Sequence, residues 1–111
     1  RKGTLYPPHR HPGKAETFHV MEGRLAVLSF DEIGDPAEVG ILGPGEVYRL
    51  NLDHYHTVMP LDDFAIYHEA KIGPFLGDND FIFPAWGPRA GDSAAMGRFL
   101  DRCVALLGDD A

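Results

Sequence analysis

The stretch "PPHRHPGKAE", residues 7–16, carries two histidines two positions apart and a carboxylate five positions beyond the second. Side chains alternate between the two faces of an extended strand, so His9 and His11 project from the same face. The Pro-Gly pair that follows suits the centre of a type II turn, because proline presets the first φ and glycine accepts a positive second φ. Such a reversal would bring Glu16 alongside His11. The stretch therefore predicts two adjacent strands from which three potential metal ligands converge.

Length and composition indicate one globular domain. The chain has 111 residues, of which 44% are hydrophobic and 24% charged, so residues 1–111 are expected to share a single core. Because the chain starts at Arg1 and almost at once enters a β-rich stretch, we expect this domain to lack some N-terminal sequence. The single cysteine excludes an intrachain disulfide, and a cytoplasmic location is expected.

The charge of the chain argues against two classes of partner. Seventeen acidic and ten basic residues give a formal charge of −7, and the basic residues form no run. Nucleic acids and anionic membrane surfaces are therefore not expected partners. No apolar run approaches the roughly 18 residues that are needed to span a bilayer.

Most of the chain is patterned as short strands. Turn signals built from Gly, Pro and Asp recur roughly every 8 to 12 residues, which is the spacing of an all-β sandwich or barrel. The segments between them are rich in β-forming residues: 17–21, 24–30, 38–42, 46–52, 56–61 and 64–71. We therefore expect a meander of antiparallel strands.

The C-terminal segment follows a helical period instead. Its apolar residues recur at helical spacing on one face, which predicts an amphipathic helix over residues 92–108 with Asp92 or Ser93 as its N-cap. These residues are Met96, Phe99, Leu100, Cys103, Val104 and Leu107. Because Cys103 belongs to this stripe, we expect a buried, inert thiol rather than a catalytic one.

Two longer spacings resemble the motifs of the cupin family. The first cupin motif is matched over its whole length by Gly3, His9, His11, Glu16 and Gly23. Gly45 and His56 stand at the ends of the second motif, whereas Asn51 and Asp53 replace its proline and glycine. The resemblance implies an all-β, antiparallel jelly-roll barrel with the helix packed outside, and a metal inside the barrel. Carried over position by position, the implied ligands are His9, His11, Glu16 and His56.

A narrower resemblance is to the WbuC family of cupin-fold metalloproteins. It rests on the histidine strand, on "HEAKIGPF" at residues 68–75 and on "DNDFIFPAWGP" at residues 78–88. Phe75 replaces the tyrosine of that family. Genes of this type occur in polysaccharide (O-antigen) biosynthesis clusters, so the resemblance implies a sugar-related role by association. Cupins commonly form dimers, so a homodimer is expected.

The ligand types agree with this resemblance on chemical grounds. Three imidazoles and one carboxylate suit one divalent Fe, Mn, Ni, Zn or Co ion and leave one or two positions open. The spacing of His9 and His11 alone would favour a chance pair of surface histidines. Together with Glu16 and His56 at these spacings, they favour a metal site.

The other polar residues allow more than one interpretation. His54 is expected in a loop. His19 is expected to face away from the metal, His68 shares the apolar face of Phe64 and Ile66, and both are expected to be packing residues. Three residues of one strand face, Tyr67, Glu69 and Lys71, either bind a substrate in the barrel or face water. If this face points inward, Lys71 favours a ligand with anionic oxygens.

Three functions are consistent with this pattern. The first is a metal-dependent enzyme that acts on a small oxygen-rich molecule such as a sugar or sugar nucleotide. The second is a non-catalytic module that binds such a small molecule through the metal. The third is an Fe(II)-dependent dioxygenase, which the ligand set allows. The catalytic residues are not identified by the sequence.

Overall fold

The structure, a computed structural model, describes residues 5–11, 16–50, 54–71 and 81–108. Its strands and its C-terminal helix confirm the expected all-β class with one amphipathic helix. The expected Pro-Gly turn, Asn51, Asp53 and Phe75 lie outside the described residues. The elements are β1 (Glu16–Glu22), β2 (Leu25–Phe30), β3 (Pro36–Leu42), β4 (Val47–Arg49), β5 (Tyr55–Pro60), β6 (Ile66–Lys71) and α1 (Ser93–Leu107).

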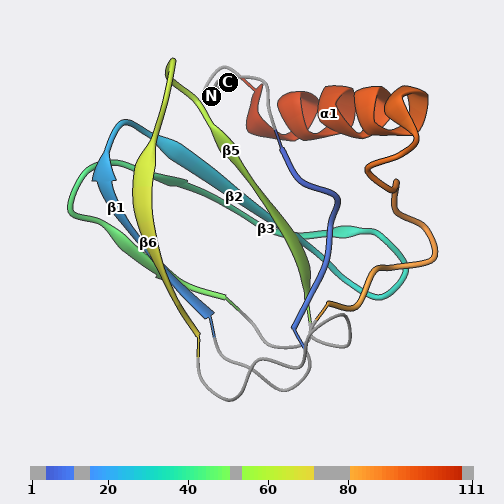
Figure 1. Ribbon diagram of the computed structural model, residues 1–111, viewed down its shortest axis with the longest axis horizontal. Coiled ribbons are helices and arrows are strands. Elements are labelled where there is room, and N and C mark those ends of the chain that lie inside the picture. The colour runs from blue at the N-terminus through green and yellow to red at the C-terminus, as the bar shows by residue number, and fades with distance from the viewer. Residues whose placement is uncertain (1–4, 12–15, 51–53, 72–80, 109–111) are drawn as a thin grey trace.

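The strands form two antiparallel sheets that face each other (Figure 1). The first sheet has the order β4-β1-β6, and the second has the order β3-β2-β5. The second sheet continues past β5, because His9 exchanges backbone hydrogen bonds of 3.1 and 2.9 Å with His56. Arg10 in turn pairs with Ile82 through bonds of 2.9 and 2.8 Å. The histidine segment is thereby held along the edge of β5.

Strand β2 separates two hydrophobic cores. All six of its residues are buried, as expected for a nearly continuous apolar run that is covered on both faces. Leu25 and Val27 point between the sheets, where they join Phe18 and Val20 of β1. The alternate residues of β2 point to the other face and pack under α1. The apolar core between the sheets lies next to the site, because the ring centroids of Phe18 and His56 are 6.0 Å apart.

Helix α1 covers the outer face of the second sheet (Figure 1). Its N-cap is Asp92, whose carboxylate accepts a 3.0 Å hydrogen bond from the backbone N–H of Ala95. Phe99, Cys103 and Leu107 are buried, as the apolar stripe predicts. Burial raises the pKa of Cys103 to about 12, so this thiol stays protonated. No helix in the described part of the chain is long and apolar enough to cross a membrane.

Trp86 anchors the segment that leads from the second sheet to the helix. Its indole packs against Phe30 and Phe99, with ring centroids 5.4 and 6.4 Å away. Gly34 lies against this indole with φ of 92°, and a Cβ atom there would come within 2.9 Å of the ring. Only glycine fits without strain at this contact. The backbone after Phe83 is therefore fixed to the helix side of the second sheet.

The helix–sheet core gives a test of this packing. Phe99 is 5% exposed and contacts Phe30, so Phe99→Ala should lower the free energy of unfolding by about 3–5 kcal/mol. Val104→Ala on the same helix is the control, because Val104 is 41% exposed and its truncation should change this free energy by about 0.5 kcal/mol or less. Urea unfolding followed by circular dichroism measures both. Equal destabilisation by the two substitutions would contradict the arrangement.

Candidate metal centre

Three histidines converge between the two sheets. One ring nitrogen each from His9, His11 and His56 can be chosen so that all three lie within 4.8 Å of one another. His9 and His56 are directly opposite in an antiparallel backbone pair, which places their side chains on the same face. His11 is on that face because it lies two residues beyond His9 in extended backbone. Strand pairing therefore assembles the group without a contribution from the helix.

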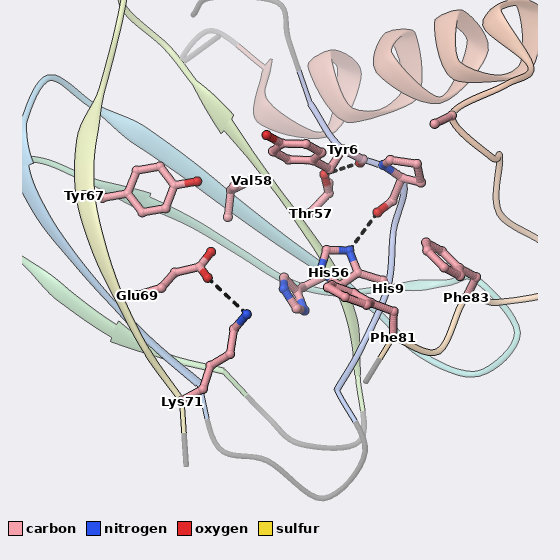
Figure 2. Close-up of a pocket in the computed structure, with 12 residues that line it drawn as sticks. Tyr6, His9, His56, Thr57, Val58, Tyr67, Glu69, Lys71, Phe81 and Phe83 are labelled. Carbon is pink, nitrogen blue, oxygen red and sulfur yellow. Dashed lines mark hydrogen bonds and ion pairs between the residues drawn. The ribbon is translucent and has the colours of Figure 1, made fainter. Parts of the chain in front are cut away.

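A backbone hydrogen bond sets the orientation of the His9 ring. Its Nδ1 lies 2.9 Å from the carbonyl oxygen of Pro7, which can only accept, so Nδ1 carries the proton (Figure 2). The lone pair of the neutral ring is then on Nε2. This is the usual arrangement of a metal-binding histidine, whose second nitrogen donates to a carbonyl or carboxylate.

Glu16 brings a carboxylate to the histidines from the opposite sheet. Its two oxygens lie 3.2 Å from Nε2 of His56 and 3.6 Å from Nε2 of His11. Glu16 begins β1, where its inward side chain is 3% exposed. The expected convergence of Glu16 with His11 is thus present in the structure.

Burial controls the protonation of His9, His56 and Glu16. It lowers the pKa of His9, and it lowers that of His56 well below the usual value, with the neighbouring histidines adding to the effect. Burial also raises the pKa of Glu16 to about 7, and the nearby Glu69 carboxylate contributes in the same direction. A buried site without a cation favours the uncharged forms of its groups, which are neutral imidazoles and a protonated carboxyl group. Three nitrogens and one oxygen fit a borderline divalent metal ion.

A cavity of about 640 Å³ opens beside His9 and His56 (Figure 2). Tyr67, Glu69 and Lys71 of β6 lie on one side of it, because they pair with the inward-facing residues of β1. Lys71 is opposite Glu16 in this register, and its Nζ lies 3.8 Å from Glu16 Oε1 and 3.5 Å from Glu69 Oε2. Of the two orientations open to these three residues, the inward one is found. That they bind a substrate stays a prediction.

The other histidines lie away from the cavity. His19 and His68 pair across β1 and β6 on the outer face of the first sheet, where both are exposed. His19 faces away from the three clustered histidines as expected, but the expectation that His19 and His68 pack is wrong, because no element covers this face among the described residues. His54 lies in a bend before β5 and does not belong to the group of three.

Several residues of the cavity were not expected from the sequence. They are Tyr6, Pro7, Thr57, Val58, Phe81, Phe83 and Ala90. A signal for two of them is the alternation in "FIF", residues 81–83, which places both phenylalanines on the same face of an extended segment. The pairing of this segment with Arg10 brings them beside the histidines, and local sequence does not reveal that pairing.

Comparison with known sequences gives two partial matches. Residues 1–42 match a family model described as a domain of unknown function, DUF6016. A germin-like protein of Arabidopsis thaliana, subfamily 1 member 5, is 44% identical over 48 residues. That match covers 41% of this chain and 22% of the relative. The chain thus spans about a fifth of the length of the curated relative.

Comparison with solved structures identifies the architecture. The capsular polysaccharide assembling protein CapF of Staphylococcus aureus superposes with a TM-score of 0.66 and 19% identity, over 76% of this chain and 26% of that one. An oxalate decarboxylase of Lactobacillus farciminis in complex with formate gives a TM-score of 0.61 and 18% identity, over 100% and 32% of the two chains. A recombinant oxalate oxidase in complex with glycolate gives 0.57 and 16%, over 99% and 60%. These likenesses and the two facing sheets show that the chain has a cupin-type jelly-roll fold.

Proposed function

We propose that this chain holds one divalent transition metal at His9, His11, His56 and Glu16 and binds a small oxygen-rich molecule through that metal. The observation that carries the proposal is the convergence of three imidazoles from two paired segments with a buried carboxylate from the opposite sheet. A buried cluster of this kind is costly unless a cation or a network of hydrogen bonds compensates it. A metal would satisfy all four groups at once.

The cavity gives the ligand access to the open coordination positions. A bound metal supplies Lewis acidity toward a carbonyl or hydroxyl oxygen of the ligand. The polar residues of β6 face the same space, and burial raises the pKa of Tyr67, so its hydroxyl is a hydrogen-bond donor at neutral pH. Glu69 and Lys71 place an acceptor and a cation beside it. These groups favour a metal-dependent enzyme, with a binding module as the alternative in which no bond changes.

The relatives suggest two classes of ligand. The oxalate decarboxylase and the oxalate oxidase are seen with formate and glycolate, which are small carboxylates. CapF assembles capsular polysaccharide, and the resemblance to the WbuC family also implies a role in polysaccharide biosynthesis. Small carboxylic acids and sugar derivatives with adjacent oxygens are therefore the molecules to test first.

Removal of one histidine tests the metal site. His56→Ala should weaken metal binding by at least about tenfold, because it removes one of four ligands from a preformed site. His19→Ala is the matched control, since His19 lies on the opposite face of its sheet and is exposed. Elemental analysis of purified protein and titration with Zn(II) measure occupancy and affinity. Full occupancy in His56→Ala, or equal losses in both variants, would contradict the assignment.

The protonation of Glu16 predicts how metal binding depends on pH. Its pKa of about 7 means that the carboxyl is mostly protonated at pH 6 and mostly ionised at pH 8. Because a metal ligand must be ionised, metal uptake at pH 6 should release about one proton more from the natural protein than from Glu16→Gln. At pH 8 this difference should nearly vanish, so affinity falls as pH drops below 7.

Calorimetric titration in two buffers of different ionisation enthalpy measures the released protons. An equal difference between the natural protein and Glu16→Gln at both pH values would show that Glu16 does not give up a proton to the metal.

A further inference from the structure

Two phenylalanines form the side of the cavity nearest the metal ligands, and we call Phe81 and Phe83 the aromatic wall. Their rings are stacked, with centroids 6.5 Å apart and planes 18° from parallel. Phe81 lies 5.0 Å from the His11 ring and 5.6 Å from the His9 ring, measured between centroids. Despite this position the two phenylalanines are 38% and 39% exposed. Paired aromatic rings that remain open to solvent beside a polar centre are typical of a face that contacts a ligand.

Two polar groups that line the cavity near the aromatic wall are already engaged within the protein, and the Arg89 guanidinium, which lies over the Phe83 ring at 4.3 Å from its centroid, is not among the cavity-lining residues. The Thr57 hydroxyl donates a 2.8 Å hydrogen bond to the carbonyl of Tyr6, and Nδ1 of His9 donates to Pro7. Val58 is apolar and lies between the aromatic wall and β6 (Figure 2). A polyhydroxylated molecule would therefore leave several hydroxyl groups without partners on this side, which is costly in a confined site.

The charges place the anionic end of a ligand at the metal and toward β6. A divalent ion with three neutral imidazoles and one carboxylate keeps a net positive charge of one, which favours an anionic oxygen at its open positions. On the same side Lys71 lies 3.8 Å from Glu16 Oε1 and 3.5 Å from Glu69 Oε2, and with Glu16 bound to the metal its ammonium group can also pair with a ligand carboxylate. The rest of a molecule held in this way would lie in the cavity, which Phe81 and Phe83 also line (Figure 2).

Because one side of the cavity is apolar and the other is charged, we infer that the ligand is a small carboxylic acid rather than a sugar. Its flat apolar body packs on Phe81 and Phe83. This inference rests on the proposed metal site and narrows its ligand class. The carboxylate binds at the metal beside Lys71, and the apolar body excludes water from the wall.

Three acids that share the same 2-hydroxycarboxylate head test this inference: mandelate carries a phenyl group, lactate a methyl group and gluconate a polyhydroxylated chain. Calorimetric titration into protein loaded with one equivalent of Zn(II) should show mandelate binding about tenfold more tightly than lactate, and gluconate more weakly than mandelate. In Phe83→Ala the preference for mandelate over lactate should fall below about threefold, with zinc content unchanged. Phe64→Ala is the control, because Phe64 is 53% exposed and does not line the cavity.

The outcomes separate this inference from the proposed metal site. If zinc is bound but mandelate and lactate bind equally, if none of the acids binds, or if the preference survives in Phe83→Ala, the aromatic wall does not recognise the ligand. Tightest binding of gluconate would also overturn the inference and would assign the site to sugar acids. Failure to bind zinc in the titrations of the natural protein would instead overturn the proposed function itself.

Discussion

The antiparallel backbone pair between His9 and His56 is the interaction on which the site depends. Its two hydrogen bonds, of 3.1 and 2.9 Å, attach an N-terminal segment to the edge of β5 across 47 positions of sequence. Side chains that are directly opposite in such a pair share a face, so the pairing itself brings two imidazoles together. His11 follows by strand alternation, and Arg10 continues the sheet to Ile82. One register thus positions the three histidines and the segment that carries the aromatic wall.

The two sheets contribute different chemistry to the cavity. The second sheet and its extension supply the three imidazoles and the aromatic rings, whereas the first supplies Glu16 and the polar residues of β6. A ligand between them therefore meets an apolar surface on one side and charged or hydroxyl groups on the other. Such an arrangement orients an asymmetric molecule, because each end is compatible with only one side.

The polar cluster lies next to an apolar core whose burial stabilises the fold and offsets the cost of burying polar groups. Burial of three imidazoles and a carboxylate opposes folding, as the lowered pKa of His56 and the raised pKa of Glu16 reflect. The core between the sheets and the core under α1 lie on opposite faces of β2, and the first of them includes Val58 and packs against Tyr67, two residues that line the cavity. Local conflicts of this kind, in which polar groups are held in a buried position by the rest of the fold, are typical of functional sites.

The features that depend on local periodicity could be predicted from the sequence. Alternation in a strand places His9 and His11 on the same face, and a helical stripe with Asp92 or Ser93 as N-cap predicts α1, whose N-cap is Asp92. The same alternation shows that Tyr67, Glu69 and Lys71 share a face, but a strand has two faces and its sequence alone did not say which one is interior. Pairing with β1 decided this, and it also left His19 and His68 on a face that nothing covers among the described residues.

The aromatic wall could be found only in the tertiary structure. The pattern "FIF" shows that Phe81 and Phe83 project together, but their position beside the histidines comes from the pairing of Ile82 with Arg10, 72 positions earlier in the sequence. Pairing between distant strands depends on the burial of whole faces and on register, and neither is encoded in a short segment. Local sequence therefore determined which side chains point together, and the packing of the two sheets decided what they face.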